Sequence, residues 1–317
     1  MESNTEFINI NQIIYTNIIM AIISFILSLL VIILYLKKKE LKEMNYTIFA
    51  CIAGSNAINC INQFFGIALI NYELPTVNKK WYATTQRILN LFAEFSYAYY
   101  SLYYFYYIYE KITTYIEKTK EYLYHIIIGI FIFTLGFSIF FVITFNLNVN
   151  DDREMRNFDG LIFLNGLLSI DDVEDSGNYI ILYYLIFFPP LILYFYILNK
   201  LRMKLSDTLK KEEAKKKGFL KKFYDFTKFL MFFGVLNLFI AIIKDSYDRL
   251  FYEEIIDRKS HYLRIEILLS FLANYLANAR GFVYFFIFLM DDKVMKIMIE
   301  YIDKINIIDK IKNLIVD

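Results

Sequence analysis

The stretch Ala277–Met298, ANARGFVYFFIFLMDDKVMKIM, decides the fold of this chain. Its first fourteen residues end an apolar run that begins near Ile265, and this run is long enough to cross a bilayer as a helix. After Met290 an acidic pair is followed by apolar residues at three- and four-residue spacing, which is typical of an amphipathic helix on a membrane surface. The stretch therefore predicts a membrane-spanning helix that continues into an interfacial one, and an arginine, Arg280, lies inside the predicted span.

The composition extends this prediction to the whole chain. Of 317 residues 58% are hydrophobic and 19% aromatic, with a mean hydropathy of +0.41, which is too apolar for an ordinary soluble domain. We expect an all-α membrane protein, a seven-helix bundle (13–290) with a short extracellular N-terminus (1–12) and an amphipathic helix or tail at the inner leaflet (291–317). The seven apolar runs are Ile13–Leu36, Tyr46–Ile70, Tyr82–Tyr109, Tyr124–Asn146, Tyr179–Leu198, Phe223–Ile243 and Ile265–Met290.

Loop charges predict the direction of the bundle. If the N-terminus is outside, the cytoplasmic loops carry 22 Lys or Arg and the outer loops eight. Because positive residues favour the cytoplasmic side, we expect the N-terminus outside and the C-terminus in the cytoplasm, in a multi-pass protein of the plasma membrane. The third inner loop, 199–222, contains ten of these basic residues.

Composition and motifs give no support for several other classes. The net charge of +1 gives no reason to expect a nucleic-acid partner, and no pattern of metal ligands or of catalytic residues is present. We expect no cofactor, no metal and no enzymatic activity. The two cysteines, Cys51 and Cys60, are nine residues apart in one predicted helix, about 13 Å, which is too far for a disulfide.

Polar residues inside the spans are candidates for an interior network, because each costs free energy in a bilayer unless it has a partner. In the second span, Asn56 and Asn59 share a helix face, and Asn274 and Asn278 do so in the seventh. Together with Asn237 of the sixth span, they are expected to face a common interior. Hydrogen bonds between helices are the simpler interpretation of these amides, and contact with a ligand is the alternative.

Charged residues in the third and seventh spans predict an ion pair. Glu94 lies about 18 Å below the outer end of its run and Arg280 about 22 Å below the end of its own, at 1.5 Å per residue. The two depths agree within one helical turn, so we expect Glu94 and Arg280 to pair. A protonated Glu94 and an Arg280 bound only to backbone carbonyls are the alternatives. Arg87 shares the face of Glu94, and Tyr97 and Tyr100 lie deep enough that their hydroxyls need partners.

Two stretches resemble a family of receptors. TTQRILNLFAEFS, residues 84–96, is similar to the glutamine-led segment of the cyclic-AMP-receptor-like group of amoebae and fungi, with Gln86, Phe92 and Ser96 at the matching spacing. NARGFVYFF, residues 278–286, resembles the QGF segment of that group and of the adhesion and secretin receptors, with Arg280 in place of Gln. The chain lacks the cysteine expected just before Gln86 and the rhodopsin-type motifs of the sixth and seventh spans.

This resemblance to seven-transmembrane G-protein-coupled receptors implies an unidentified extracellular ligand and a heterotrimeric G protein as partners. The coupling face would include Glu110 and Lys111, a degenerate form of the acidic-Arg-aromatic motif that ends the third span. It would also include basic residues of the third inner loop, namely Lys215, Lys216, Lys217, Lys221 and Lys222. The alternatives are a small transporter or channel, with Glu94, Arg280 and the amides lining a pathway, and an enzyme or structural bundle without transport or signalling.

Overall fold

The described part of the chain is helical. The computed structural model describes residues 10–71, 76–113, 120–144 and 260–305, together with short pieces at 188–189, 191–200, 202–203, 228–229, 232–237, 239–240, 242–244, 246–247 and 250–251. These residues form α1 (Ile10–Lys37), a short 3-10 turn η1 (Lys39–Leu41), α2 (Met44–Asn71), α3 (Thr76–Thr113), α4 (Lys120–Thr144), α9 (Ser260–Leu289) and α10 (Asp292–Ile305). They contain no strand, which confirms the expected all-α class for these segments.

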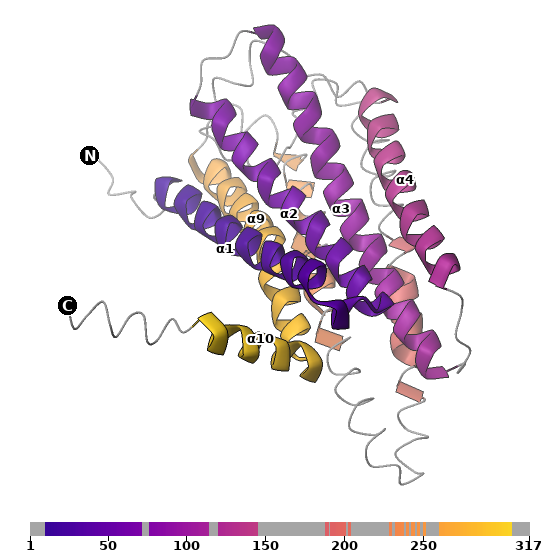
Figure 1. Ribbon diagram of the computed structural model, residues 1–317. Helices are drawn as coiled ribbons and strands as arrows, with labels where there is room; N and C mark the ends of the chain where they lie inside the picture. Colours follow the sequence, from indigo (N-terminus) through magenta and orange to yellow (C-terminus); the bar gives the residue numbers. More distant parts are fainter. Residues whose placement is uncertain are drawn as a thin grey trace, which may run out of the picture.

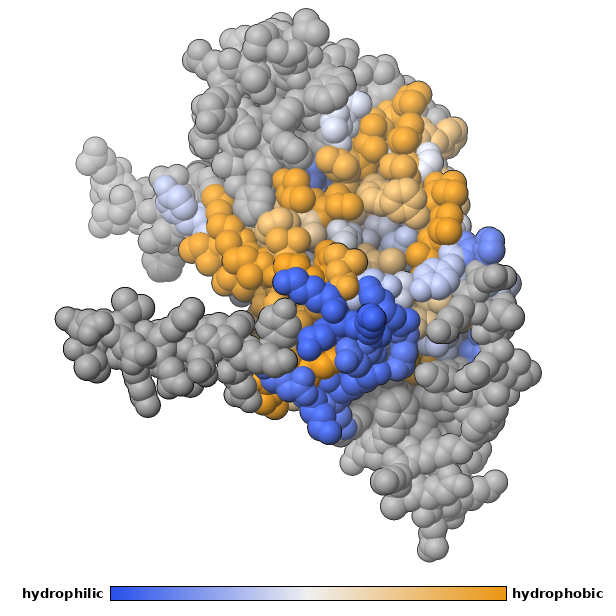
Figure 2. Space-filling view, in the orientation of Figure 1, coloured by the Kyte–Doolittle hydropathy of each residue, from blue (hydrophilic) through white to orange (hydrophobic). Residues whose placement is uncertain are grey.

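Among the described residues, three helices are long and apolar enough to cross a membrane, over Tyr15–Lys37, Tyr122–Ile143 and Phe271–Leu289. Large apolar side chains of α1 and α4 are exposed, among them Ile19 at 58% and Ile143 at 70%. Figure 2 shows the apolar residues as a broad band on the viewed face, whereas the hydrophilic residues gather at the end that carries α10. A surface of this kind suits a lipid bilayer, so the prediction of a membrane protein is supported by both length and exposure.

The predicted second and third spans form the helices α2 and α3, and the described residues of these two helices are not among the three segments apolar enough to span a membrane. Amides in α2 and tyrosines in α3 lower their hydropathy. Of the fifth and sixth predicted spans, the structure describes the shorter apolar segments Leu191–Lys200 and Phe232–Lys244. The count of seven spans therefore stays a prediction.

The helices pack side by side in a bundle, as Figure 1 shows. α2 packs against α1, α3 and α9, α1 also packs against α9, and α3 packs against α4. This arrangement places α2 at the centre of the described helices. Residues far apart in the sequence, in α1 and α9, thereby become neighbours and can build a shared interior.

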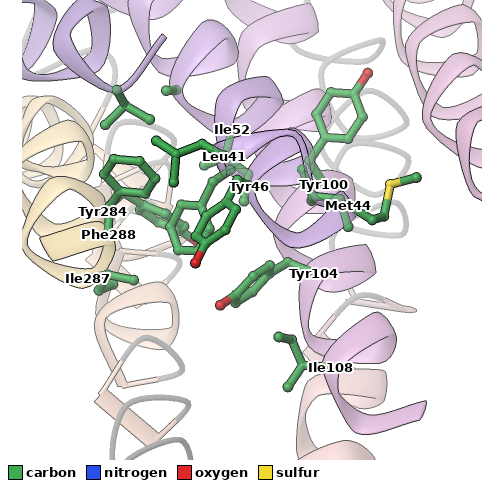
Figure 3. Close-up of a cluster of buried hydrophobic side chains, with 14 of the residues drawn as sticks. Leu41, Met44, Tyr46, Ile52, Tyr100, Tyr104, Ile108, Tyr284, Ile287 and Phe288 are labelled. Atoms are coloured by element: carbon green, nitrogen blue, oxygen red, sulfur yellow. The ribbon is translucent and has the colours of Figure 1, made fainter. Parts of the chain in front are cut away.

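The interior is divided along its length. The main apolar core, which we call the aromatic core, lies at the end where α10 sits, and Figure 3 shows part of it. Buried polar residues concentrate in the other half, which we call the amide half. Its members in α1, α2 and α9 include Asn17, Asn56, Asn59 and Asn278, which are 0–3% exposed. The buried amides of the described helices thus lie in one half of the bundle and the aromatic core in the other.

The segment predicted to be an amphipathic helix contains the helix α10. Val294 is fully buried and Ile297 is 7% exposed, so one face of α10 contributes to the aromatic core. Met295 and Ile299 on another face are exposed. The predicted contact with the inner leaflet would involve this exposed apolar face.

The predicted direction of the bundle can be checked by labelling intact cells. Single cysteines at Asn4 or Ser176 are expected to react with an impermeant maleimide, and one at Ser206 is not, because the loop charges place 199–222 inside. The native Cys51 and Cys60 of α2 are free, so both are first replaced by alanine to remove background labelling. Surface labelling at Ser206 would reverse the assigned orientation.

Candidate functional site

Glu94 of α3 and Arg280 of α9 meet inside the bundle. The Nη2 atom of Arg280 lies 3.8 Å from Oε1 of Glu94, and the side chains are 14% and 17% exposed, respectively. This separation is that of an ion pair and is too long for a direct hydrogen bond between these two atoms. The structure therefore brings together the two charges that the sequence predicted to pair. Both side chains are far from full solvation, and each charge compensates the other.

Tyr97 of α3 completes the surroundings of Arg280. Its ring lies 4.8 Å from the guanidinium carbon, which is a cation–π distance. The same ring packs edge-on against Tyr284 of α9 with a centroid separation of 5.2 Å. The hydroxyls of Tyr284 and Ser101 are 2.6 Å apart and share a hydrogen bond between α9 and α3. A continuous set of contacts thus runs from the ion pair to the aromatic core.

Asn56 of α2 links to α1 beside Arg280. Its Nδ2 donates to the Oγ atoms of Ser28 at 2.8 Å and Ser24 at 3.1 Å. The neighbouring residue of α9 is Gly281, where a Cβ atom would collide with Ser24 and Asn56. The absent side chain lets three helices approach one another closely at this level.

Several amides of the amide half have polar atoms without a described partner. Both side-chain atoms of Asn17 and of Asn278 are buried in this way, as are Nδ2 of Asn59 and Oδ1 of Asn56. The Nε atom of Arg280 belongs to the same group. Buried polar groups normally have a partner, so these atoms offer both donors and acceptors to a polar molecule.

Three other predicted residues lie away from the ion pair. Tyr100 is buried and donates from its hydroxyl to the Ile127 carbonyl of α4 at 3.2 Å, so it joins α3 to α4. Asn237 of the sixth predicted span donates to the Leu276 carbonyl of α9 at 3.5 Å, a long bond that links these two segments. Glu110 lies near the end of α3, where it accepts from Tyr106 at 3.5 Å.

The remaining predicted residues fall where side chains are not described. Arg87 lies in α3, Lys111 in α3 and Asn274 in α9, and their side chains are outside the described part. The basic residues of the third inner loop are outside it altogether, namely Lys215, Lys216, Lys217, Lys221 and Lys222. Their predicted roles stay predictions.

Sequence reasoning did not identify Ser24, Ser28 and Tyr284 as parts of this site. Ser24 and Ser28 are four residues apart in an apolar helix, a pattern of small residues that signals close helix packing. Tyr284 follows Arg280 by one turn, so the same face of α9 carries both. These signals were readable, although they do not tell which neighbouring helix each residue meets.

The arrangement suits recognition of a polar molecule by hydrogen bonds. Amide groups of three helices and a balanced ion pair lie together, and such groups fix the orientation of a ligand. Among the described residues, no group of three His, Cys, Asp or Glu is placed to hold a metal ion.

Comparison with known proteins identifies no family for this chain: no family model matches it, and no curated protein matches its sequence. Functional conclusions therefore rest on the residues and contacts described above.

Proposed function

We propose that this protein is a seven-helix cell-surface receptor that binds an extracellular ligand and signals through a heterotrimeric G protein. The observation that carries the proposal is the divided interior, with the amide half ending at Glu94 and Arg280 and the aromatic core closing the opposite end. With the N-terminus outside, the amide half faces the exterior and the aromatic core faces the cytoplasm.

The ligand would enter the amide half from outside. There it would meet amide donors and acceptors of α2 and α9 and, at the bottom, the ion pair. Because the ion pair touches Tyr97 and Tyr97 touches Tyr284, a ligand that displaces Arg280 also disturbs the top of the aromatic core. A shift between two packed arrangements of this core is a physical route for a signal to the cytoplasmic side.

The divided interior favours a receptor over a transporter. A transport pathway opens in turn to each side of the membrane, so the half that opens inward needs polar residues to line it. At the α10 end, Phe49 packs against Tyr104 at 4.6 Å and against Phe288 at 5.7 Å between ring centroids. Close aromatic contacts of this kind suit a sealed bundle that transmits a change of packing.

A charge-removal experiment tests the coupling. Changing Lys215, Lys216 and Lys217 together to glutamine is expected to weaken G-protein activation, because this basic loop would face the cytoplasmic partner. The measurement is GTPγS loading of purified heterotrimers on membranes with matched surface expression of the variant and the native receptor. Replacing Lys37 by glutamine, an exposed lysine at the end of α1, provides a control for the loss of positive charge outside this loop. Unchanged loading in the triple variant of Lys215, Lys216 and Lys217, and also in a Lys221→Gln, Lys222→Gln double variant, would favour the transporter alternative.

A further inference from the structure

We propose that two polar contacts form a clasp that ties α10 to the start of α2 and keeps the cytoplasmic end of the bundle closed. The first contact joins Lys293 to Glu43, and the second joins Asp291 to Tyr46. The clasp is distinct from the ligand site in the amide half, and it requires no assumption about receptor function.

The first contact is short, but both of its side chains are exposed to solvent. Nζ of Lys293 lies 2.6 Å from Oε1 of Glu43, and the two side chains are 40% and 53% exposed. A solvent-exposed ion pair contributes little free energy, and breaking it leaves no buried charge behind. This contact can therefore open and close at small cost.

The second contact depends on a carboxylate with two roles. Oδ2 of Asp291 accepts a hydrogen bond from the hydroxyl of Tyr46 at 3.0 Å. Its Oδ1 accepts from the backbone N–H of Lys293 at 2.9 Å and of Val294 at 3.3 Å, so Asp291 also caps the start of α10. The two oxygens divide the roles, and Tyr46 can be released while the helix cap remains.

The clasp lies next to the aromatic core. Tyr46 packs edge-on against Phe288 of α9 at 6.2 Å between ring centroids, and Figure 3 shows both residues in the core. α9 ends at Leu289, two residues before Asp291, so the last turn of α9 is held by the same contacts. Val294 and Ile297 cover the core from α10. Opening the clasp would free α10 and uncover this end of the core.

Spin labels on α10 and on the neighbouring turn measure the state of the clasp. Cysteines replacing Glu40 of η1 and Glu300 of α10, both exposed, would carry the labels in full-length protein with Cys51 and Cys60 changed to alanine. We expect one narrow distance distribution for the unchanged clasp. Tyr46→Phe combined with Lys293→Glu is expected to add a longer, broader component, because both contacts are lost.

Exchange of the charges separates the clasp from general damage to the fold. With Tyr46 intact, Lys293→Glu alone is expected to broaden the distribution, and Glu43→Lys with Lys293→Glu is expected to restore the narrow one. Asp291→Ser keeps a capping hydroxyl but lacks the acceptor for Tyr46, so Asp291→Ser with Lys293→Glu should resemble Tyr46→Phe with Lys293→Glu. Lys296→Glu, on the exposed part of the same helix, is the matched control and should change nothing. A distribution that stays narrow in Tyr46→Phe with Lys293→Glu, or no recovery on charge exchange, would overturn the proposal.

Discussion

Replacing Glu94 with glutamine is expected to lower the midpoint of thermal unfolding of the purified protein by roughly 5–10 °C. The change leaves the charge of Arg280 without its partner at a site where the side chain is only 14% exposed. Removing one member of a buried pair typically costs about 3 kcal/mol, because the other charge stays poorly solvated. A guanidinium cannot lose its proton to escape this cost.

Arg280→Gln is also expected to lower the midpoint, because it removes the positive charge that lies 3.8 Å from the Glu94 carboxylate. The double variant should be more stable than the sum of the two single effects predicts, since it leaves neither charge unpaired. Lys37→Gln, at an exposed position, should leave the midpoint unchanged and is the control for charge removal. Additive losses in the double variant would show that Glu94 and Arg280 are energetically independent.

Gly281→Ala is expected to destabilise the protein by about 1–3 kcal/mol, the usual range for overpacking a close-packed site. A Cβ atom at this position would lie 2.7 Å from the backbone oxygen of Ser24 and still closer to the Ser24 hydroxyl and the Asn56 amide. A side chain can rotate away, but a backbone oxygen cannot, so α1 would have to move away from α9. Thermal unfolding monitored by the loss of monomeric protein in detergent measures the effect.

Glycines elsewhere in the bundle provide the matched controls for Gly281→Ala. At Gly54 of α2 and at Gly136 of α4, an added Cβ meets nothing within 4 Å. Gly54→Ala and Gly136→Ala should therefore be neutral or stabilising by up to about 1 kcal/mol, because alanine has the higher helix propensity. Ser24→Ala should rescue Gly281→Ala only in part, since the backbone oxygen remains. Equal effects at all three glycines would contradict the close packing of α1 with α9.

The helices were predictable from sequence to the extent that hydropathy marks them. α1, α4 and α9 coincide with apolar runs, because a bilayer-spanning helix needs a minimum apolar length. The start of α3 was less accurate, at Thr76 where the apolar run predicts Tyr82. Backbone hydrogen bonding in α3 continues through TVNKKW, and hydropathy does not report on it.

Contacts between helices could be predicted only where the depth of a charged residue in its span restricted its possible partners. Depth in the membrane sufficed for Glu94 and Arg280, because two charges inside a bundle have few possible partners. The link from Asn56 to Ser24 and the clasp at Asp291 were not predicted. Both depend on how each helix is rotated about its own axis, which side-chain packing sets and a periodic pattern alone does not.

The proposed signalling function is tested most directly by co-purification of the protein with a heterotrimeric G protein. Full-length protein captured from membranes mixed with Gαβγ and treated with apyrase is expected to retain the heterotrimer, and added GTPγS is expected to release it. The Lys215→Gln, Lys216→Gln, Lys217→Gln variant, captured in equal amount, should retain less. Retention that is equal with and without GTPγS, or no retention of any heterotrimer class from well-folded protein, would contradict the receptor account.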